Sequence, residues 1–209
     1  MKARDETQVA DVQQNRATFL ARQGIEMNET TLVRMTYDSN NYLRYETLTS
    51  DDMGDGMTRP PTFKSDGLVV TEPGHALFLP LADCIGAVIH DPVKNIMMLS
   101  HLGRHNLEQF GATQSIKYLI KEHGVNPGDL TIWLSPAASK EHYPLYSFDN
   151  RSLHDVATEQ FMAAGAMKEN IEVSPIDSAA DENYYSHSQF LKGNRSNDGR
   201  FVVVAMMNT

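Results

Sequence analysis

The sequence predicts an α+β fold: one compact domain of mixed β-sheet layers with flanking helices. Short apolar segments typical of strands and amphipathic segments typical of helices both occur, but they do not alternate as regular βαβ units. The chain has 209 residues, enough for one domain with a substantial core. Its hydrophobic content of 41% and charged content of 22% are ordinary for a globular protein. We therefore expect a single domain over residues 1–209.

The N-terminal part of the chain predicts a helix, two short strands and a loop. Side chains that recur at three- and four-residue steps indicate an amphipathic helix ending at Gly24. These positions are Val9, Val12, Arg16, Phe19 and Leu20. Residues 31–37 and 42–45 are strand candidates on either side of the turn Asp38–Asn41. Residues 49–64 are rich in Asp, Gly, Met and Pro, which predicts an exposed loop.

Four strand candidates follow in the middle of the chain. They are Gly67–Thr71, His75–Leu79, Ile85–Ile89 and Ile96–Ser100. The last two are separated by His90–Asn95, whose Asp, Pro and Asn residues predict a hairpin turn. Beyond them, residues 107–122 predict a helix with Gly124 near its C-cap. Residues 130–134 predict a strand, 152–163 a second long helix, and 172–173 and 201–206 the late strands.

The charge of the chain excludes several classes of partner. The formal net charge is −9, so the field of the whole protein disfavours nucleic acid and anionic membranes. A small anionic substrate would need local cations. We find no run of about 18 apolar residues and no signal peptide, so we expect no membrane span. With a single cysteine, these features predict a cytoplasmic protein.

Cys84 and His101 are the candidate reactive residues. Cys84 is the only cysteine, so any special role must come from its thiolate, as a nucleophile or as a soft metal ligand. The predicted strands bring it to the same edge of a sheet as His101. A lone cysteine is most often a small buried hydrophobe. The two residues together favour a site, either a Cys–His nucleophilic pair or a zinc site with a third protein ligand. Their spacing does not choose between these.

Other polar residues could join such a site, although each has a simpler explanation. Asp38 and Ser39 lie in a turn where these residue types are common. His142 and Tyr143 follow Ser135–Ala138 and could face the same cavity, or could be ordinary surface residues. The sequence contains no phosphate-binding glycine loop, dinucleotide fingerprint or CxxC motif.

Several motifs, in order along nearly the whole chain, resemble the YfiH or laccase-domain family, often labelled polyphenol oxidase or peptidoglycan editing factor. They are Ser65–Gly74, Leu81–Cys84, His90–Pro92, His101–Gly103, Trp133–Ala137, Gln160–Gly165, Tyr185–Ser186 and Gly199–Arg200. The resemblance implies an α+β fold related to cysteine hydrolases and a metal-associated site of two histidines and one cysteine. It also implies phosphorolysis of purine nucleosides, with phosphate as the second substrate, and deamination of adenosine.

The chain departs from the family pattern at the site itself. Alignment places Ser39 where the family has its first histidine, and Arg104 is displaced by one position within the family's W-R-G motif. The family's C-C-Y becomes Glu141–Tyr143. Cys84 and His101 would then hold zinc poorly unless Asp38 or His142 completes the site. Copper fits less well, because none of the eight histidines forms a His-x-His pair.

Three functional hypotheses follow. In the first, the protein is a divergent enzyme in which Cys84 and His101, with zinc or as a dyad, act on a purine nucleoside, with Asp38, Ser39, Arg104, His142 and Tyr143 contacting the substrate. In the second, the fold persists without catalysis and binds a partner. In the third, Cys84 and His101 hydrolyse an amide without metal. Retention of both residues favours an enzyme.

Overall fold

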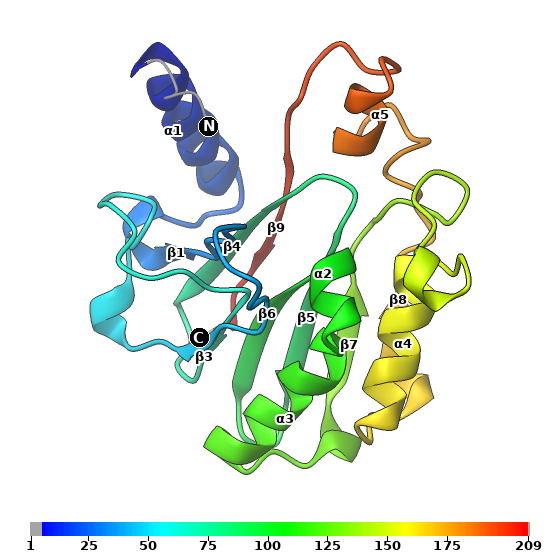
Figure 1. Ribbon diagram of the computed structural model, residues 1–209. Coiled ribbons are helices and arrows are strands. Elements are labelled where there is room, and N and C mark those ends of the chain that lie inside the picture. The colour runs from blue at the N-terminus through cyan, green and yellow to red at the C-terminus, as the bar shows by residue number, and fades with distance from the viewer. Residues whose placement is uncertain (1–5, 209) are drawn as a thin grey trace.

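The structure is a computed structural model that describes residues 6–208, with side chains described from residue 10, so the predicted helix position Val9 lies outside the described side chains. A six-stranded sheet in the order β2-β3-β6-β5-β7-β8 forms its centre (Figure 1). The strands are β2 (Tyr45–Thr47), β3 (Gly67–Val70), β5 (Ile85–Asp91), β6 (Ile96–Leu102), β7 (Thr131–Leu134) and β8 (Ile171–Val173). The four inner strands pair antiparallel, and each edge strand is parallel to its neighbour.

A second, three-stranded sheet packs against one face of the first. It has the order β1-β4-β9, with β1 (Thr30–Leu32) parallel to β4 (Ala76–Leu81) and β9 (Phe201–Ala205) antiparallel to β4. An apolar core fills the space between the two sheets; it includes Leu68, Val70, Leu77, Leu79, Leu99 and Val203. The two sheets therefore form the inner layers of the domain.

Helices form the outer layers. The helices α2 (Arg104–Glu108), α3 (Gly111–His123) and α4 (Leu153–Ala163) cover the other face of the six-stranded sheet (Figure 1). The helix α1 (Glu6–Arg22) packs its Leu20 on the outer face of the three-stranded sheet, and α5 (His187–Leu191) precedes β9. Single-turn helices lie at Met27–Glu29, Ser50–Asp52, Pro127–Asp129, Tyr146–Phe148 and Lys168–Asn170. None of the helices in residues 6–208 combines the length and apolar character needed to cross a membrane.

The alternation of side chains along β5 and β6 decides where Cys84 and His101 point. Ile85, Ala87 and Ile89 pack toward the helices, so the intervening positions of β5 face the three-stranded sheet. Cys84 and Val88 accordingly contact the core between the sheets. On β6 the same alternation places His101 on the face that carries Met97 and Leu99. Both candidate residues thus share the inter-sheet side.

The predicted α+β class is confirmed, and most predicted elements occur within one or two residues of their predicted bounds. The helix predicted over residues 107–122 is wrong as one helix, because Phe110 adopts φ +60° and separates α2 from α3. The Asn106 side chain lies beside this break and donates to the carbonyl of Tyr42 at 2.6 Å. Its Oδ1 lies 1.6 Å from where a Cβ on Gly111 would be, so only glycine fits there.

The segment between β1 and β3 differs more from its prediction. β1 ends at Leu32, and residues 42–44 do not join a strand. The backbone N–H of Arg44 donates to the carboxylate of Asp66 rather than to a neighbouring strand. The predicted loop 49–64 is mostly exposed, but Asp55 and Met57 are each 1% exposed, so this segment is packed against the domain at its middle.

The ion pair between Arg44 and Asp66 anchors the segment 33–44 beside β6. Arg44 Nε donates to Asp66 Oδ2 at 2.7 Å and Nη2 donates to Oδ1 at 3.0 Å, while the Asp66 side chain is 2% exposed. The backbone carbonyl of Asp66 accepts from the N–H of His101 at 2.8 Å. The same residue therefore supports both the segment and the strand that carries His101.

We expect Asp66→Asn to lower the free energy of unfolding by about 3 kcal/mol, because it leaves a partly buried guanidinium without its charged partner. Urea denaturation followed by circular dichroism measures this. The matched control is Asp38→Asn, which removes a carboxylate that is 53% exposed and should cost much less. Equal losses in the two variants would contradict the anchoring role of Asp66.

Candidate functional site

The pairing of β5 with β6 brings Cys84 and His101 together. Ile85 lies opposite Leu102 in the ladder, so Cys84, one residue before β5, lies opposite Gly103, one residue after β6. A Cβ on Gly103 would lie 2.8 Å from Cys84 Sγ and 3.0 Å from His101 Nε2. The sulfur and the ring nitrogen are therefore within about 6 Å of each other. Glycine at position 103 leaves the space between them open.

Both reactive groups are electrically neutral near pH 7. His101 is 6% exposed, and this burial lowers its pKa to about 4. Burial also raises the pKa of Cys84 to about 12, and the adjacent Asp83 raises it further. Within residues 6–208 no hydrogen bond joins the two side chains. The pair is consequently a thiol beside an imidazole, and not a thiolate–imidazolium ion pair.

Two arginines and two tyrosines surround the thiol. The positive charges of Arg200 and Arg104 lower the pKa of Cys84 against the effect of burial. Burial raises the pKa of Tyr143, and the proximity of Cys84 raises it further. Desolvation of its hydroxyl also raises the pKa of Tyr37, and Cys84 and Tyr143 raise it further, although the residue as a whole is largely exposed. These phenols and guanidiniums therefore interact electrostatically with the cysteine.

Tyr37 is part of an aromatic cluster at the mouth of this site. Its ring centroid lies 6.0 Å from that of Tyr42 and 6.4 Å from that of His105. Tyr42 and His105 are stacked with centroids 4.9 Å apart and planes 16° apart. Tyr37 itself is 67% exposed. The cluster offers flat, partly solvent-facing rings next to the Cys84–His101 pair.

The predicted residues Asp38 and Ser39 make their contacts within the turn and with the side chains of Lys64 and Arg44. Asp38 accepts hydrogen bonds from Lys64 and from Thr36, which hold its pKa at about 2. Ser39 Oγ accepts from the backbone N–H of Asn41 at 3.3 Å. Neither side chain forms a hydrogen bond with Cys84 or His101.

The remaining predicted residues separate into two groups. Arg104, at the exposed start of α2, lowers the pKa of Cys84. Cys84 in turn raises the pKa of the half-buried Tyr143, after the effect of burial. His142 instead pairs through Nδ1 with Asp177 Oδ2 at 2.8 Å. Burial alone would raise the pKa of Asp177, but hydrogen bonds from Ser139, Ala179 and His142 outweigh it and hold the pKa at about 2.

Sequence reasoning missed three residues of the site: Tyr37, Asp83 and Arg200. Tyr37 lies two positions before Ser39, so a small shift in the alignment of the turn would have found it. Asp83 and Arg200 lie within the motifs Leu81–Cys84 and Gly199–Arg200, but a motif alone does not show that they belong to one site. Only the fold brings these distant segments together.

The donor set does not fit a three-ligand metal site. Among the residues that the structure describes, no group of three or more His, Cys, Asp or Glu side chains is arranged to hold a metal ion. Asp38 is paired with Lys64, and Nδ1 of His142 is paired with Asp177. Catalytic zinc sites normally have three protein ligands. Cys84 and His101 supply two, so we derive no chemistry through a metal.

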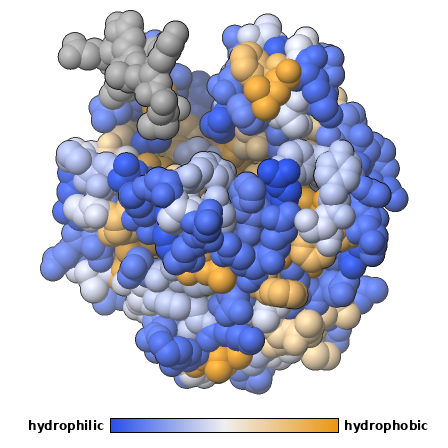
Figure 2. Space-filling model, in the orientation of Figure 1, coloured by the Kyte–Doolittle hydropathy of each residue, from blue (hydrophilic) through white to orange (hydrophobic). Residues whose placement is uncertain are grey.

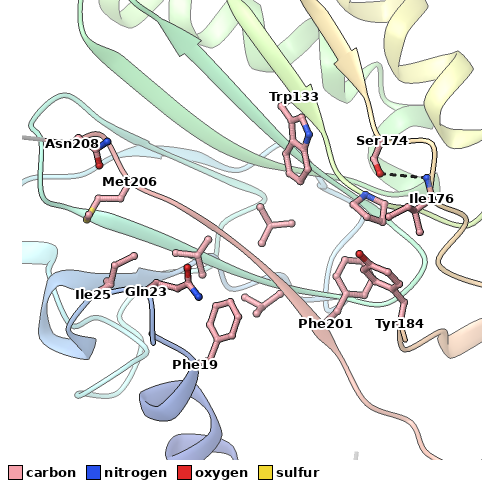
Figure 3. Close-up of a pocket in the computed structure, with 14 residues that line it drawn as sticks. Phe19, Gln23, Ile25, Trp133, Ser174, Ile176, Tyr184, Phe201, Met206 and Asn208 are labelled. Atoms are coloured by element: carbon pink, nitrogen blue, oxygen red, sulfur yellow. Dashed lines mark hydrogen bonds between the residues drawn. The ribbon is translucent and has the colours of Figure 1, made fainter. Parts of the chain in front are cut away.

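A separate cavity of about 550 Å³ lies along β9, between α1 and the segment that precedes α5. Figure 3 shows Phe19 and Trp133 on opposite sides of β9, with Tyr184 near Phe201. Figure 2 shows the surface hollowed between α1 and α5, with apolar atoms in the hollow. The lining includes neither Cys84 nor His101 and has no cluster of titratable groups. We therefore place the candidate reaction site at Cys84, outside this cavity.

Comparison with known proteins identifies a relative of this chain and solved structures that share its fold. One curated relative, the purine nucleoside phosphorylase YlmD of Bacillus subtilis, is 27% identical over 150 residues. That match covers 70% of this chain and 51% of the relative, so it spans about half of the relative's length.

Solved structures show the same fold at lower identity. YfiH of Bacillus licheniformis superimposes with a TM-score of 0.83 at 20% identity, covering 94% of this chain and 81% of that one. YlmD of Geobacillus stearothermophilus gives 0.82 at 20% identity, covering 96% and 81%. The family model described as multi-copper polyphenol oxidoreductase laccase matches residues 1–151. Together with the fold, this match shows that the chain belongs to the laccase-like YfiH family.

Proposed function

We propose that the protein is an enzyme of the purine nucleoside phosphorylase type whose reaction centre is the Cys84–His101 pair. The observation that carries this proposal is the position of a partly buried thiol and a neutral imidazole on either side of Gly103, with two arginine charges acting on the thiol. The curated relative that carries the name purine nucleoside phosphorylase supports the choice of reaction. We propose both the substrate, a purine nucleoside, and the reaction, phosphorolysis.

Phosphorolysis makes specific demands on such a site. A phosphate oxygen forms a bond to C1′ of the ribose while the bond from C1′ to the purine nitrogen breaks. The proton that the leaving purine needs is supplied by dihydrogen phosphate, so the products are a free purine and a ribose 1-phosphate. The site must therefore hold an oxyanion next to the sugar and stabilise a leaving nitrogen.

The residues around Cys84 suit these demands. Arg104 and Arg200 provide the local cations that the net charge of −9 would otherwise deny to phosphate. The neutral Cys84 thiol can donate a hydrogen bond to the leaving purine, and neutral His101 can accept one from phosphate or ribose. The rings of Tyr37 and Tyr42 offer faces for the base. Deamination of adenosine uses no oxyanion, so the two arginines favour phosphorolysis.

The first prediction concerns activity. We expect the purified protein to release base from adenosine, inosine or methylthioadenosine in the presence of phosphate. Cys84→Ala and His101→Ala should each lower kcat/KM by about 10²-fold or more, since each removes a hydrogen-bonding group that assists proton movement. His90→Ala is the matched histidine control, because His90 lies at the far end of β5.

A folded protein without turnover would contradict the proposal and favour the non-catalytic, partner-binding alternative. Hydrolysis of amide substrates that persists in chelator would instead favour the metal-free Cys–His hydrolase. Measuring base release with and without phosphate separates phosphorolysis from hydrolysis.

The second prediction concerns the thiol. Because the pKa of Cys84 is raised to about 12, the thiolate fraction near pH 8 is far below that of a free cysteine, whose pKa is about 8.5. We expect iodoacetamide to alkylate the folded protein at pH 8 at least about tenfold more slowly than the urea-unfolded protein. The rate should still be rising at pH 10. A rate that levels off below pH 8 would show a stabilised thiolate and contradict the neutral-thiol state.

The third prediction concerns metal. Since only two donors meet at the site, we expect the dialysed protein to contain less than one equivalent of zinc or copper per chain by elemental analysis. Treatment with a chelator should leave phosphorolysis unchanged. One tightly held equivalent that disappears in Cys84→Ala would establish a metal site and contradict this prediction.

A further inference from the structure

The segment 184–200 forms an arm that contains α5 and leads into β9 (Figure 1). Residues 184–187 contact residues 198–201 at three places. The Tyr184 and Phe201 rings meet edge to face with centroids 5.3 Å apart, and His187 Nδ1 lies 2.9 Å from Asp198 Oδ1. A Cβ on Gly199 would lie 2.3 Å from the Tyr185 ring, so that ring packs directly on the glycine. The arm is therefore held in shape by its own side-chain contacts.

Asp83 fastens this arm beside the reactive cysteine. Its carboxylate accepts hydrogen bonds from the Ser186 hydroxyl and from the Ser188 backbone N–H, the latter at 2.7 Å. Asp83 is 3% exposed, and its own carbonyl accepts from the N–H of Ala138 at 2.8 Å. It adopts φ +77°, a conformation that costs a non-glycine residue about 1–3 kcal/mol. The contacts of its carboxylate offset this strain.

Arg200, at the end of the arm, uses only one of its three guanidinium nitrogens in hydrogen bonds within the described part of the chain. Its Nη1 donates to Asp198 Oδ1 at 2.6 Å and to the carbonyl of Gly199 at 2.6 Å. Within the described part of the chain, Nη2 and Nε have no hydrogen-bond acceptor, and the side chain is 41% exposed. A guanidinium held on one side and free on the other is suited to bind an oxyanion.

We propose that Asp83 is a positioning residue that fixes the arm 184–200, so that Arg200 binds the oxyanion substrate beside Cys84. In the reaction proposed above, on which the identity of the ligand rests, this oxyanion is inorganic phosphate. Asp83 acts through the Ser186 and Ser188 contacts and touches no reacting atom. Arg200 supplies the charge, and Asp198 orients it from the side away from the ligand.

The electrostatic surroundings of the site agree with this placement. The positive charge of Arg200 lowers the pKa of both Cys84 and Tyr37, which belong to segments far from the arm in sequence. Arg104 lowers the pKa of Cys84 and Tyr143 in the same way. The β4–β9 ladder ends with Leu81 opposite Phe201, so the backbone of Arg200 lies opposite Ala82, two residues before Cys84. Two guanidiniums from different elements thus act on one thiol.

Four variants test the proposal: Arg200→Gln, Asp83→Asn, the double variant, and Lys192→Gln as the control. Lys192 is an exposed cation on the same arm, and it is not among the charges that act on Cys84. Calorimetric titration with inorganic phosphate gives Kd, and steady-state assays give KM for phosphate separately from KM for the nucleoside.

We expect Arg200→Gln to raise Kd and KM for phosphate at least tenfold, with KM for the nucleoside changed less than twofold. Asp83→Asn should change phosphate binding in the same direction. The double variant should be no worse than Arg200→Gln alone, because once the arginine is gone its positioning has no further effect. Lys192→Gln should match the unmodified protein.

Should Asp83→Asn fail to fold, Ser188→Pro provides a second test. It removes the backbone N–H that donates to Asp83 together with the Ser188 hydroxyl that contacts Ser186 at 3.2 Å, and it leaves Asp83 and Arg200 unchanged; the position is in the first turn of α5, where proline is tolerated. Phosphate binding unchanged in Arg200→Gln would overturn the proposal, as would additive losses in the double variant. Phosphate binding without turnover would contradict the proposed function alone, whereas turnover with unchanged phosphate binding in Arg200→Gln would contradict the arm alone.

Discussion

The antiparallel register between β5 and β6 determines the chemistry available to this protein. Because Gly86 pairs with His101, the residue before β5 meets the residue after β6, and Cys84 and His101 lie on either side of Gly103. A shift of one residue would move His101 to the face that carries the helices, since side chains alternate along a strand. The register is protected by the apolar cores on both faces of the hairpin, which admit only one alternation of these strands.

Burial, more than charge, sets the state of the site. The same desolvation that keeps Cys84 protonated keeps His101 unprotonated, so the two side chains have no ionic attraction for each other. The charged groups are placed around them instead, on α2 and on the arm that precedes β9. The result is a neutral centre with charges of both signs near it, Asp83 on one hand and the guanidiniums of Arg104 and Arg200 on the other. The anion binding that we propose relies on the two guanidiniums.

The part of the fold that could be predicted from the sequence is the part with regular periodicity. The hairpin containing Cys84 and His101 has apolar strands on both sides of an Asp-Pro-Val-Lys-Asn turn, so the pairing of these two strands could be predicted. The division of α2 from α3 could not be predicted, because the helical pattern does not mark the left-handed Phe110, and the Asn106 side chain beside it contacts Tyr42 more than sixty residues earlier. Tyr37 and Arg200 were missed for the same reason: irregular segments carry them, and tertiary contacts alone determine where such segments lie.

The contact between Asp83 and Ser186 joins residues 103 positions apart, and β9 pairs with β4 across a still longer span. During synthesis, the hairpin of β5 and β6 can form long before either of these partners exists. A nascent chain that has just passed α4 would contain the cysteine and the histidine but neither the arm nor its arginine. The Cys84–His101 pair is thus held together by neighbouring residues, whereas the arginine that we propose for anion binding comes from a segment that is synthesised after α4.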